Sequence, residues 1–487
     1  MRCGILHTPE VHADPSRIIE VPVLIFKARQ ASLPPMVNLS GGPGQSWADL
    51  GLDTLTASET QLLPMDFVFI EQRGTGLSRP RLDCPTQGDK ESDSALVARC
   101  VSDLRAQGTN IAAYNIQEMA EDVATFQSML GYPKITLDGV SYGTAWGLQI
   151  LRAHSESLGS ALLDSVVNPT IPTFSASASA TDAAFSAAFS DCAADSSCKA
   201  SYGDLKAKME AALASLKTKP LTVAGTTVSY DDNAFFNDAV SVQALAPNLL
   251  PRLIGAITAA IAGGSGQVLY DSDINSVIGT DNQAVSGIAL AQYLSVVCSD
   301  NQFVTASQVR ADLGKVNPAF APYLDYSANL QICQTWPYQQ RNASDYSAVV
   351  SSVATLLVSG SLDPLTSPDW AKQAASTLSN GYWVEFPGLG HDEQASTNSC
   401  PESILVGFLK SPGPPDMSCV QSMTIAFDAP ANPITLAIDA QHGIALPGTQ
   451  AARLGLIERL AARMRIENAI ARRHVHRRVA GLMRPGR

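Results

Sequence analysis

The sequence contains few charged residues and no hydrophobic run long enough to cross a membrane. Charged side chains make up 16% of its 487 residues and hydrophobic ones 45%. These proportions are typical of a globular protein with an ample core and exclude a disordered or coiled-coil chain. The longest apolar stretch, 248–264, is interrupted by Pro251 and Arg252 and falls short of the roughly 20 residues that a span needs. The net charge of −12 repels nucleic acids and anionic membranes. We therefore expect no integral membrane span and no nucleic-acid partner, while the oligomeric state stays open.

Cysteine pairs of the C-x-x-C type are also absent, and the cysteine spacings do not suggest zinc. Nine cysteines are nevertheless present. After Cys3 they follow one another in four pairs: Cys84 and Cys100, Cys192 and Cys198, Cys298 and Cys333, and Cys400 and Cys419. Eight cysteines can be joined in many ways, so the connectivity stays open. Their number predicts disulfides and a secreted or periplasmic protein. Buried free thiols in a cytosolic protein are the alternative.

The first residues lack the apolar segment of a signal peptide. Cys3 is left over once the four pairs are formed. We therefore expect that the printed sequence starts within a longer secreted precursor, in which Cys3 has a partner.

Short apolar runs alternate with helical patterns in two parts of the chain. In the first part, strand-like runs lie at 18–28, 35–40, 66–74, 134–139 and 161–168, and a helical pattern lies at 111–130. In the second, the strand-like runs are 353–360 and 381–386, and the helical ones are 369–378 and 399–410. This alternation predicts an α/β fold with a mostly parallel sheet and helices on both faces.

The region between these two parts is rich in alanine and serine and has helical patterns, as at 203–219. We therefore predict one sheet interrupted by a large helical lid, rather than two successive folds. The predicted division is a first part of the core at 1–170, the lid at 171–348, a second part of the core at 349–425, and a C-terminal extension at 426–487. The end of that extension, 451–487, has ten arginines and two glutamates. It is suited to an anionic surface or partner, unless it is a solvated tail unrelated to the activity of the core.

A serine between glycines follows the strand-like run 134–139. The stretch Gly139-Val140-Ser141-Tyr142-Gly143 has the Gly-x-Ser-x-Gly pattern, preceded by a predicted strand and followed by a predicted helix. In that context the pattern is typical of a nucleophile elbow, a sharp turn whose small neighbours permit a strained serine. We therefore predict Ser141 as a nucleophile, near the carboxyl end of the sheet.

A serine hydroxyl needs a base and a carboxylate that orients the base, and in this architecture they follow in the order serine, acid, histidine. Only His391, in the loop 387-PGLGHDE-393, follows a predicted strand and precedes a predicted helix. Asp363 lies in the turn after the preceding strand. We therefore predict Asp363 and His391 as the other two members of a triad. The other histidines lie before the serine, at the end of its helix or beyond the last predicted strand: His7, His12, His154, His442, His474 and His476.

Acyl transfer also requires hydrogen-bond donors for the oxyanion. One predicted donor is the backbone N–H of Tyr142. The other is predicted in the glycine loop 39-LSGGPGQS-46, at Gly41 or Gly42, because glycine lets the backbone approach a substrate closely. A phosphate-binding loop is disfavoured because no lysine follows at the required spacing. No set of residues for a metal or redox cofactor stands out, so we expect none.

Together these motifs resemble the proline iminopeptidase and tripeptidyl aminopeptidase family of α/β-hydrolases, the S33 serine peptidases. The resemblance covers roughly 3–425, and the segment 400–419 looks like the TAP-like C-terminal region of the secreted tripeptidyl aminopeptidases. Two positions depart from the family pattern, since Ser40 stands where the family often has histidine and Glu71 where it often has aspartate. The motifs that carry the resemblance are GGPGQS, DFVFIEQRGTGLSRP, GVSYGT, GSLDPLTSP and GLGH.

The resemblance implies an aminopeptidase that releases proline or short peptides from free N-termini through an acyl-enzyme. Ser141 would attack the carbonyl, His391 would transfer the proton, and Asp363 would orient His391. The resemblance also leads us to expect an ion pair between Glu71 and Arg73 that braces the loops. The lid would supply carboxylates for the substrate's ammonium group, with four candidates among others: Asp231, Asp232, Asp238 and Asp300.

Two other readings of the same residues remain. An esterase or amidase that acts on small molecules would use the same triad, because the triad cleaves both bond types. A non-catalytic binding protein on a hydrolase scaffold has no use for a serine, an acid and a histidine together, so the complete set disfavours it.

Overall fold

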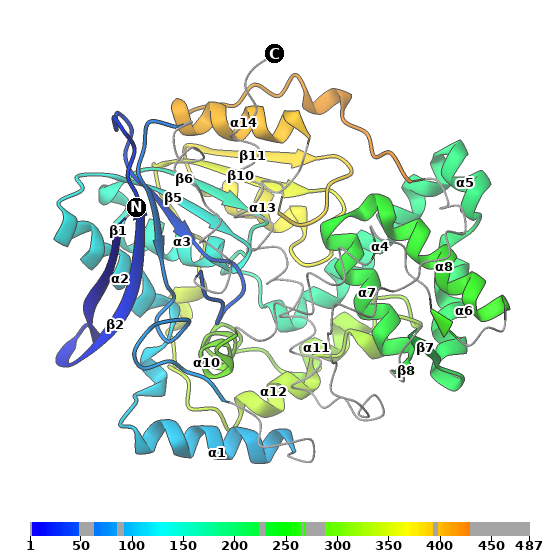
Figure 1. The fold of residues 1–487 in the computed structure, drawn as a ribbon, viewed down its shortest axis with the longest axis horizontal. Coiled ribbons are helices and arrows are strands. Elements are labelled where there is room, and N and C mark those ends of the chain that lie inside the picture. The colour runs from blue at the N-terminus through cyan, green and yellow to red at the C-terminus, as the bar shows by residue number, and fades with distance from the viewer. Residues whose placement is uncertain are drawn as a thin grey trace.

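The computed structural model describes residues 2–47, 63–84, 92–223, 229–263, 267–268, 274, 288–392 and 398–428. Within them, an eight-stranded sheet has the order β1-β2-β4-β3-β5-β6-β10-β11 (Figure 1). The strands are β1 (Arg2–Val11), β2 (Asp14–Phe26), β3 (Met36–Leu39), β4 (Phe67–Ile70), β5 (Ile135–Val140), β6 (Leu158–Asp164), β10 (Ala354–Gly360) and β11 (Gly381–Phe386). Pairing is antiparallel from β1 through β2 to β4 and parallel from β4 to β11. The predicted mostly parallel sheet is thus confirmed.

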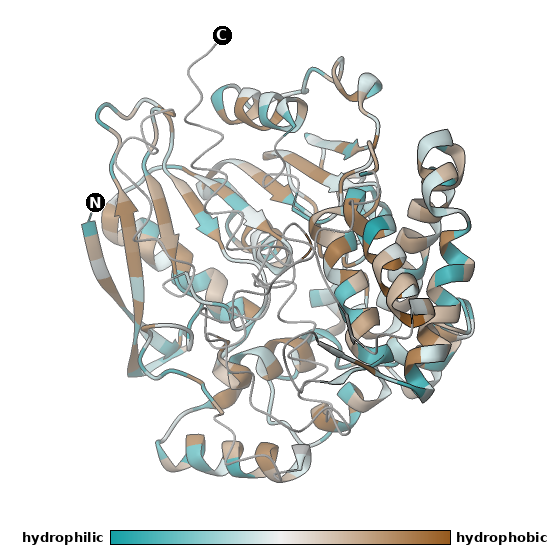
Figure 2. Cartoon of the chain, turned by 45° about the vertical axis from the view of Figure 1, so that its right-hand side comes forward, coloured by the Kyte–Doolittle hydropathy of each residue, from teal (hydrophilic) through white to brown (hydrophobic). Residues whose placement is uncertain are grey.

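The parallel strands are buried on both faces, in keeping with their largely apolar runs. Successive residues of β3 show the two faces. Met36 belongs to the same core cluster as Phe408 of α14 (Ser399–Lys410). Val37 belongs to the cluster on the other face, with Met119 of α2 (Ile116–Leu130) and Trp146 of α3 (Tyr142–His154). The strands of the sheet are mostly coloured as hydrophobic in Figure 2.

Helix α2 illustrates how local sequence sets the ends of these elements. The side chain of Asn115 accepts a hydrogen bond from the backbone N–H of Glu118 at the start of the helix, and Gly131 ends it with a φ of 65°. Glycine adopts this left-handed conformation without steric cost. Three other helices of the core are α1 (Asp93–Ala106), α13 (Pro368–Ala375) and α14, and the last two correspond to the predicted helices.

Strand β1 was not predicted. It pairs with β2 as a long hairpin at the edge of the sheet. Its first four residues are exposed, and buried positions alternate only toward its end. A strand with so few buried side chains lacks the apolar run that identifies the central strands.

The helices between β6 and β10 are α4 (Ser177–Ala194), α5 (Ser196–Tyr202), α6 (Leu205–Thr218), α7 (Asp232–Leu245), α8 (Leu250–Gly263), α10 (Leu290–Asp300), α11 (Ala306–Leu313) and α12 (Ser327–Cys333). Helices α10 and α12 share a core cluster with α1. The first five form a group beside the sheet, coloured green in Figure 1. Phe185, Phe236 and Phe320 contact one another in their core, with ring centroids 5.6 to 5.8 Å apart. That core continues into Val140 and Leu362 of the sheet region, so the group packs onto the edge where the strands end.

Four disulfides join the cysteines in sequential pairs: Cys84–Cys100, Cys192–Cys198, Cys298–Cys333 and Cys400–Cys419. Cys3 is a free, exposed thiol. Every helix in the described part of the chain is too short or too polar to cross a bilayer. The predicted basic tail at 451–487 lies outside the described residues.

Candidate active site

The turn between β5 and α3 holds Ser141 in a strained conformation, with φ 55° and ψ −123°. Non-glycine residues rarely adopt a positive φ, and such strain is concentrated at functional sites. The flanking glycines allow the turn. A Cβ atom on Gly139 would lie 2.5 Å from the carbonyl oxygen of Gly143, and one on Gly143 would lie 2.1 Å from that of Leu39. Larger residues would not fit, so the glycines of the motif have a steric role at this elbow.

Asp363 and His391 lie in the loops that follow two neighbouring parallel strands, β10 and β11. The distance from Asp363 Oδ2 to His391 Nδ1 is 2.7 Å, and only 1% and 3% of these residues are exposed. The other carboxylate oxygen, Oδ1, accepts hydrogen bonds from the backbone N–H groups of Leu365 (2.7 Å) and Thr366 (3.0 Å). These bonds fix the carboxylate, which in turn orients the imidazole.

Thr366 is a member of this cluster that sequence analysis missed. Its hydroxyl donates to Asp363 Oδ2 at 2.6 Å and lies 3.2 Å from His391 Nδ1. The available signal was its position three residues after Asp363, within the same turn. Thr366 therefore helps to hold the acid and the histidine together.

The remaining ring nitrogen of His391, Nε2, is buried and has no hydrogen-bond partner among the described residues. The expected hydrogen bond from Ser141 is therefore not formed in this state, although the two residues come from the same edge of the sheet. Hydrogen bonds between catalytic groups are often long without a substrate and tighten when one binds. An unpartnered Nε2 is free to accept a proton.

The pKa of His391 is raised above its ordinary value. Burial alone lowers the pKa, because it disfavours the imidazolium. The charge of Asp363, its hydrogen bond and the charges of Asp392 and Asp164 together outweigh burial. The surroundings of His391 thus stabilise the protonated ring that a general base becomes.

The glycine loop, in which the second oxyanion donor is predicted, lies against the elbow. A Cβ atom on Gly41 would be 2.9 Å from the carbonyl oxygen of Val140 and 3.2 Å from Ser141 Cβ. Gly42 has a φ of 58°. Tyr142 is the first residue of α3, so its N–H has no acceptor in the preceding turn of the helix. The loop and the start of the helix thus place backbone groups around Ser141.

Gln72 holds the glycine loop in place, a role that sequence analysis also missed. Its Nε2 donates to Ser40 Oγ (2.9 Å) and to the carbonyl oxygen of Gly42 (3.1 Å), while its Oε1 accepts from the N–H of Gly44 (3.0 Å). Ser40, the departure from the family's histidine, is thereby integrated into the loop.

The predicted ion pair between Glu71 and Arg73 is wrong. Arg73 instead forms a two-bond pair with Asp122 of α2, at 2.8 and 2.7 Å. Glu71 accepts hydrogen bonds from the hydroxyls of Ser46 (2.7 Å) and Thr75 (2.8 Å). The two side chains contact different elements, because the chain turns after β4 and sends them in different directions. Glu71 thus braces the glycine loop through Ser46, whereas Arg73 ties the turn after β4 to α2.

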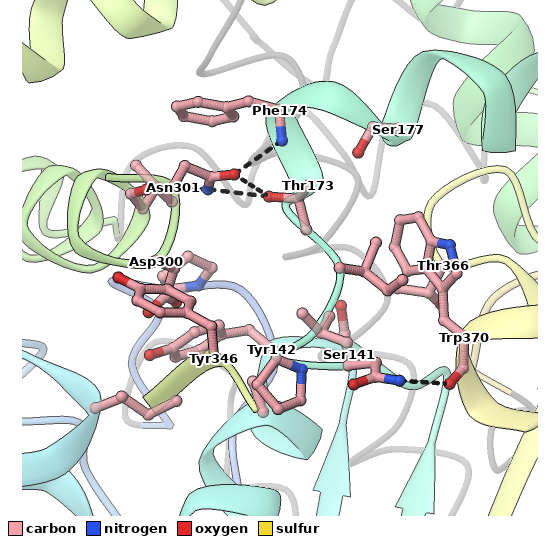
Figure 3. Close-up of a pocket in the computed structure, with 18 of the residues that line it drawn as sticks. Ser141, Tyr142, Thr173, Phe174, Ser177, Asp300, Asn301, Tyr346, Thr366 and Trp370 are labelled. Atoms are coloured by element: carbon pink, nitrogen blue, oxygen red, sulfur yellow. Dashed lines mark hydrogen bonds between the residues drawn. The ribbon is translucent and has the colours of Figure 1, made fainter. Parts of the chain in front are cut away.

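A cavity of about 1010 Å³ opens next to Ser141. In Figure 3, Asp300, Tyr346 and Tyr142 lie on one side of Ser141, with Thr366 and Trp370 on the other. The remaining aromatic side chains of its lining are Phe174, Tyr293 and Tyr326. The charged residues of the lining are Arg152, Asp300 and Arg341.

Asp300 is the one candidate carboxylate among the four predicted from the lid that lines this cavity. It pairs with Arg341 at 2.5 Å. Burial raises the pKa of Asp300, although Arg341 acts in the opposite direction. The other three are used elsewhere. Asp231 caps α7, Asp232 accepts from Tyr323, and Asp238 accepts from Tyr230.

Clusters of three or more histidine, cysteine, aspartate or glutamate side chains that could hold a metal ion do not occur among the described residues.

The chain is similar to known families and to individual known proteins. The family described as "alpha/beta hydrolase fold" matches residues 34–245, and the family described as "TAP-like protein" matches residues 317–420. Proteins named serine protease Hip1, from Mycobacterium tuberculosis and Mycobacterium bovis, are each 23% identical over 450 residues, with 84% of either chain covered. Among solved structures, a hydrolase from Pseudomonas aeruginosa has a TM-score of 0.36 and 11% identity, covering 84% of this chain and 99% of that one.

Proposed function

Because this chain is an α/β-hydrolase with a TAP-like C-terminal region, we propose that it is a serine peptidase acting on the free N-termini of peptides. The observation that carries the proposal is the buried pair of Asp363 and His391, at the same edge of the sheet as the strained Ser141 and next to a cavity. A serine hydrolase needs this combination, whereas a binding protein does not.

In the proposed mechanism, Ser141 Oγ attacks the carbonyl carbon of the scissile bond while His391 Nε2 accepts its proton. The backbone N–H of Tyr142 and that of Gly41 or Gly42 bind the oxyanion of the tetrahedral intermediate. Protonated His391 then donates the proton to the leaving amine, which leaves an acyl group on Ser141. Water attacks this ester with His391 again as the base, and the acid is released.

Asp363 keeps the proton of His391 on Nδ1, so that Nε2 is the basic nitrogen. The unpartnered state of Nε2 supports this assignment, since the atom has no competing donor in the described part of the chain.

Asp300 is the proposed acceptor for the substrate's ammonium group. It lines the cavity with Ser141, so a peptide bound there would have its N-terminus at a limited distance from the reacting carbonyl. The cavity is lined on several sides by aromatic and apolar side chains and opens to solvent, which suits the end of a short peptide. We propose that the products are proline or di- and tripeptides.

An esterase or amidase for small molecules is the second candidate, because the same triad and the aromatic lining of the cavity would serve it. The two functions differ in their need for a free amine. Reporter substrates H-Pro, H-Ala and H-Ala-Ala-Pro, each with its N-acetylated twin, and a short-chain nitrophenyl ester separate them.

If the protein is an aminopeptidase, it should cleave the free-amine substrates and cleave the acetylated twins only slightly. Asp300→Asn should lower kcat/KM for the free-amine substrates by roughly 10- to 100-fold, the worth of a charged hydrogen bond, and should leave ester hydrolysis much less affected. Asp238→Asn, a lid carboxylate outside the cavity lining, is the matched control. Equal cleavage of both twins would make the esterase the better description.

The four disulfides support a secreted or periplasmic location, since such bonds persist in oxidising compartments. Alkylation of native protein followed by mass spectrometry should modify one cysteine, Cys3, or none if Cys3 has a partner. Modification of most of the nine would refute this location.

A further inference from the structure

The charges on the wall of the cavity do not balance. Of its three charged lining residues, Arg341 is paired with Asp300 at 2.5 Å. Arg152 has no carboxylate partner among the described residues. Its guanidinium donates to Ser347 Oγ (3.0 Å), to the carbonyl oxygen of Ser347 (2.6 Å) and, at 3.5 Å, to that of Asp345. The wall thus carries one positive charge in excess.

Three buried donors on the same lining are also unused. Arg152 Nε, Arg341 Nε and the hydroxyl of Tyr142 have no hydrogen-bond partner in the described part of the chain. All three residues line the cavity. A buried donor without an acceptor costs about 1–3 kcal/mol, so a ligand that brings acceptors would recover that free energy.

The environment of Arg152 agrees with a missing counter-ion. Burial lowers the pKa of Arg152, the nearby Asp345 raises it, and Arg341 lowers it further, so that it lies below its ordinary value. Arginine remains charged in proteins even so. An anion next to Arg152 would relieve both the burial of its charge and the repulsion from Arg341.

We propose that Arg152, with Arg341 and Tyr142, forms a subsite for a carboxylate of the substrate, beside the proposed ammonium acceptor Asp300. The inference rests on the proposed peptidase function and specifies its substrate class. A carboxylate is the anion that peptides carry, and a guanidinium binds it with parallel hydrogen bonds. The carboxylate belongs to an aspartate or glutamate side chain of the peptide or to the C-terminus of a short peptide.

Matched peptides distinguish these sources. In the first arm, reporter peptides with an uncharged leaving group carry either glutamate or glutamine at the first or second position. In the second arm, peptides without acidic side chains end in either a free carboxylate or an amide. We expect kcat/KM to be about tenfold higher for the carboxylate member in one arm, which corresponds to about 1.4 kcal/mol.

Arg152→Gln should bring that ratio close to one. Arg105→Gln is the control, because Arg105 is exposed on α1 and does not line the cavity, and its replacement changes the net charge equally. It should keep the full ratio. Arg152 also ties α3 to the loop at Ser347, so Arg152→Lys is included, which retains the charge and should retain part of the preference. A role in holding that loop would change stability, measured by thermal unfolding, but not the ratio.

A ratio near one for the unaltered enzyme in both arms, or a ratio that survives in Arg152→Gln, would overturn the carboxylate subsite. Failure of the peptidase function is distinguishable from this. If no peptide is cleaved, the same pairs are tested as inhibitors of nitrophenyl ester hydrolysis, and the ratio of their inhibition constants then reports on the subsite alone.

Discussion

Replacing Gly143 by alanine should move the start of α3 away from β3 and thereby displace Ser141. The added Cβ would lie 2.1 Å from the carbonyl oxygen of Leu39 and 3.0 Å from that of Ser40. Both atoms belong to the backbone at the end of a central strand, so no flexible side chain can move aside. Relief of the contact requires a shift of about 1 Å, since non-bonded carbon atoms attract at about 3.5–4.0 Å and repel strongly well inside that range.

A shift of this size has two consequences. Overpacking of a core costs about 1–3 kcal/mol of stability. The higher helix propensity of alanine offsets about 1 kcal/mol of that cost. A misplacement of about 1 Å at a catalytic group lowers the rate by about a hundredfold. We therefore expect Gly143→Ala to lose up to about 2 kcal/mol in its free energy of unfolding and about two orders of magnitude in kcat/KM.

The assay compares urea unfolding and kcat/KM on the best reporter substrate for Gly143→Ala and for Gly407→Ala. A Cβ on Gly407, in α14, would meet no atom within 4 Å. This control should gain about 1 kcal/mol from helix propensity and keep its activity.

Near-normal activity and stability in Gly143→Ala would refute the packing argument. A loss of stability with kcat/KM within about threefold of the parent would refute the narrower claim that contact between α3 and β3 positions Ser141.

Two further predictions concern pH and a disulfide. Because His391 must be neutral to act as a base and its pKa is raised, kcat/KM should rise with pH through a midpoint above about 6.5, and a midpoint below that value would contradict the assignment. Protonation of His391 should also stabilise the fold, and this contribution should be complete below the ordinary pKa of histidine. It should be lost as the pH rises through the raised pKa of His391 in the folded protein. Unfolding curves measured across this pH range would report it. Replacement of both Cys298 and Cys333 by serine opens a loop of 35 residues and should cost about 4 kcal/mol in unfolding free energy. Cys298 lies two residues before Asp300, so cleavage of free-amine substrates should fall as well; an unchanged urea midpoint would contradict the expected stabilisation.

Much of the fold could be predicted from short stretches of sequence. The central strands, such as β5 and β10, are buried on both faces. Their short, largely apolar runs are therefore readable without knowing their neighbours. Strand β1 was not predicted because its own sequence lacks an apolar run. Its extended conformation is stabilised by pairing with β2.

The candidate site shows the same division. Ser141 could be predicted because its requirements lie within five residues, with a glycine on each side of a strained turn. Asp363 and His391 could be predicted because each lies in a loop after a predicted strand, in the order serine, acid, histidine. The structure brings these two side chains together. Thr366 and Gln72 could not be predicted, since their hydroxyl and amide groups acquire a role only when the loops meet.

The sequence by itself determined most of the strands and helices, the elbow at Ser141 and the resemblance to a family, because these depend on backbone conformation and burial over a few residues. The tertiary structure decided which partner Arg73 binds, which of the predicted carboxylates lines the cavity, and that Arg152 lines it with no carboxylate partner in the described part of the chain. These outcomes depend on contacts between distant segments, such as that between Arg152 and Ser347, 195 residues apart. The fold brings such groups together, and their hydrogen-bond partners and the balance of their charges depend on that arrangement.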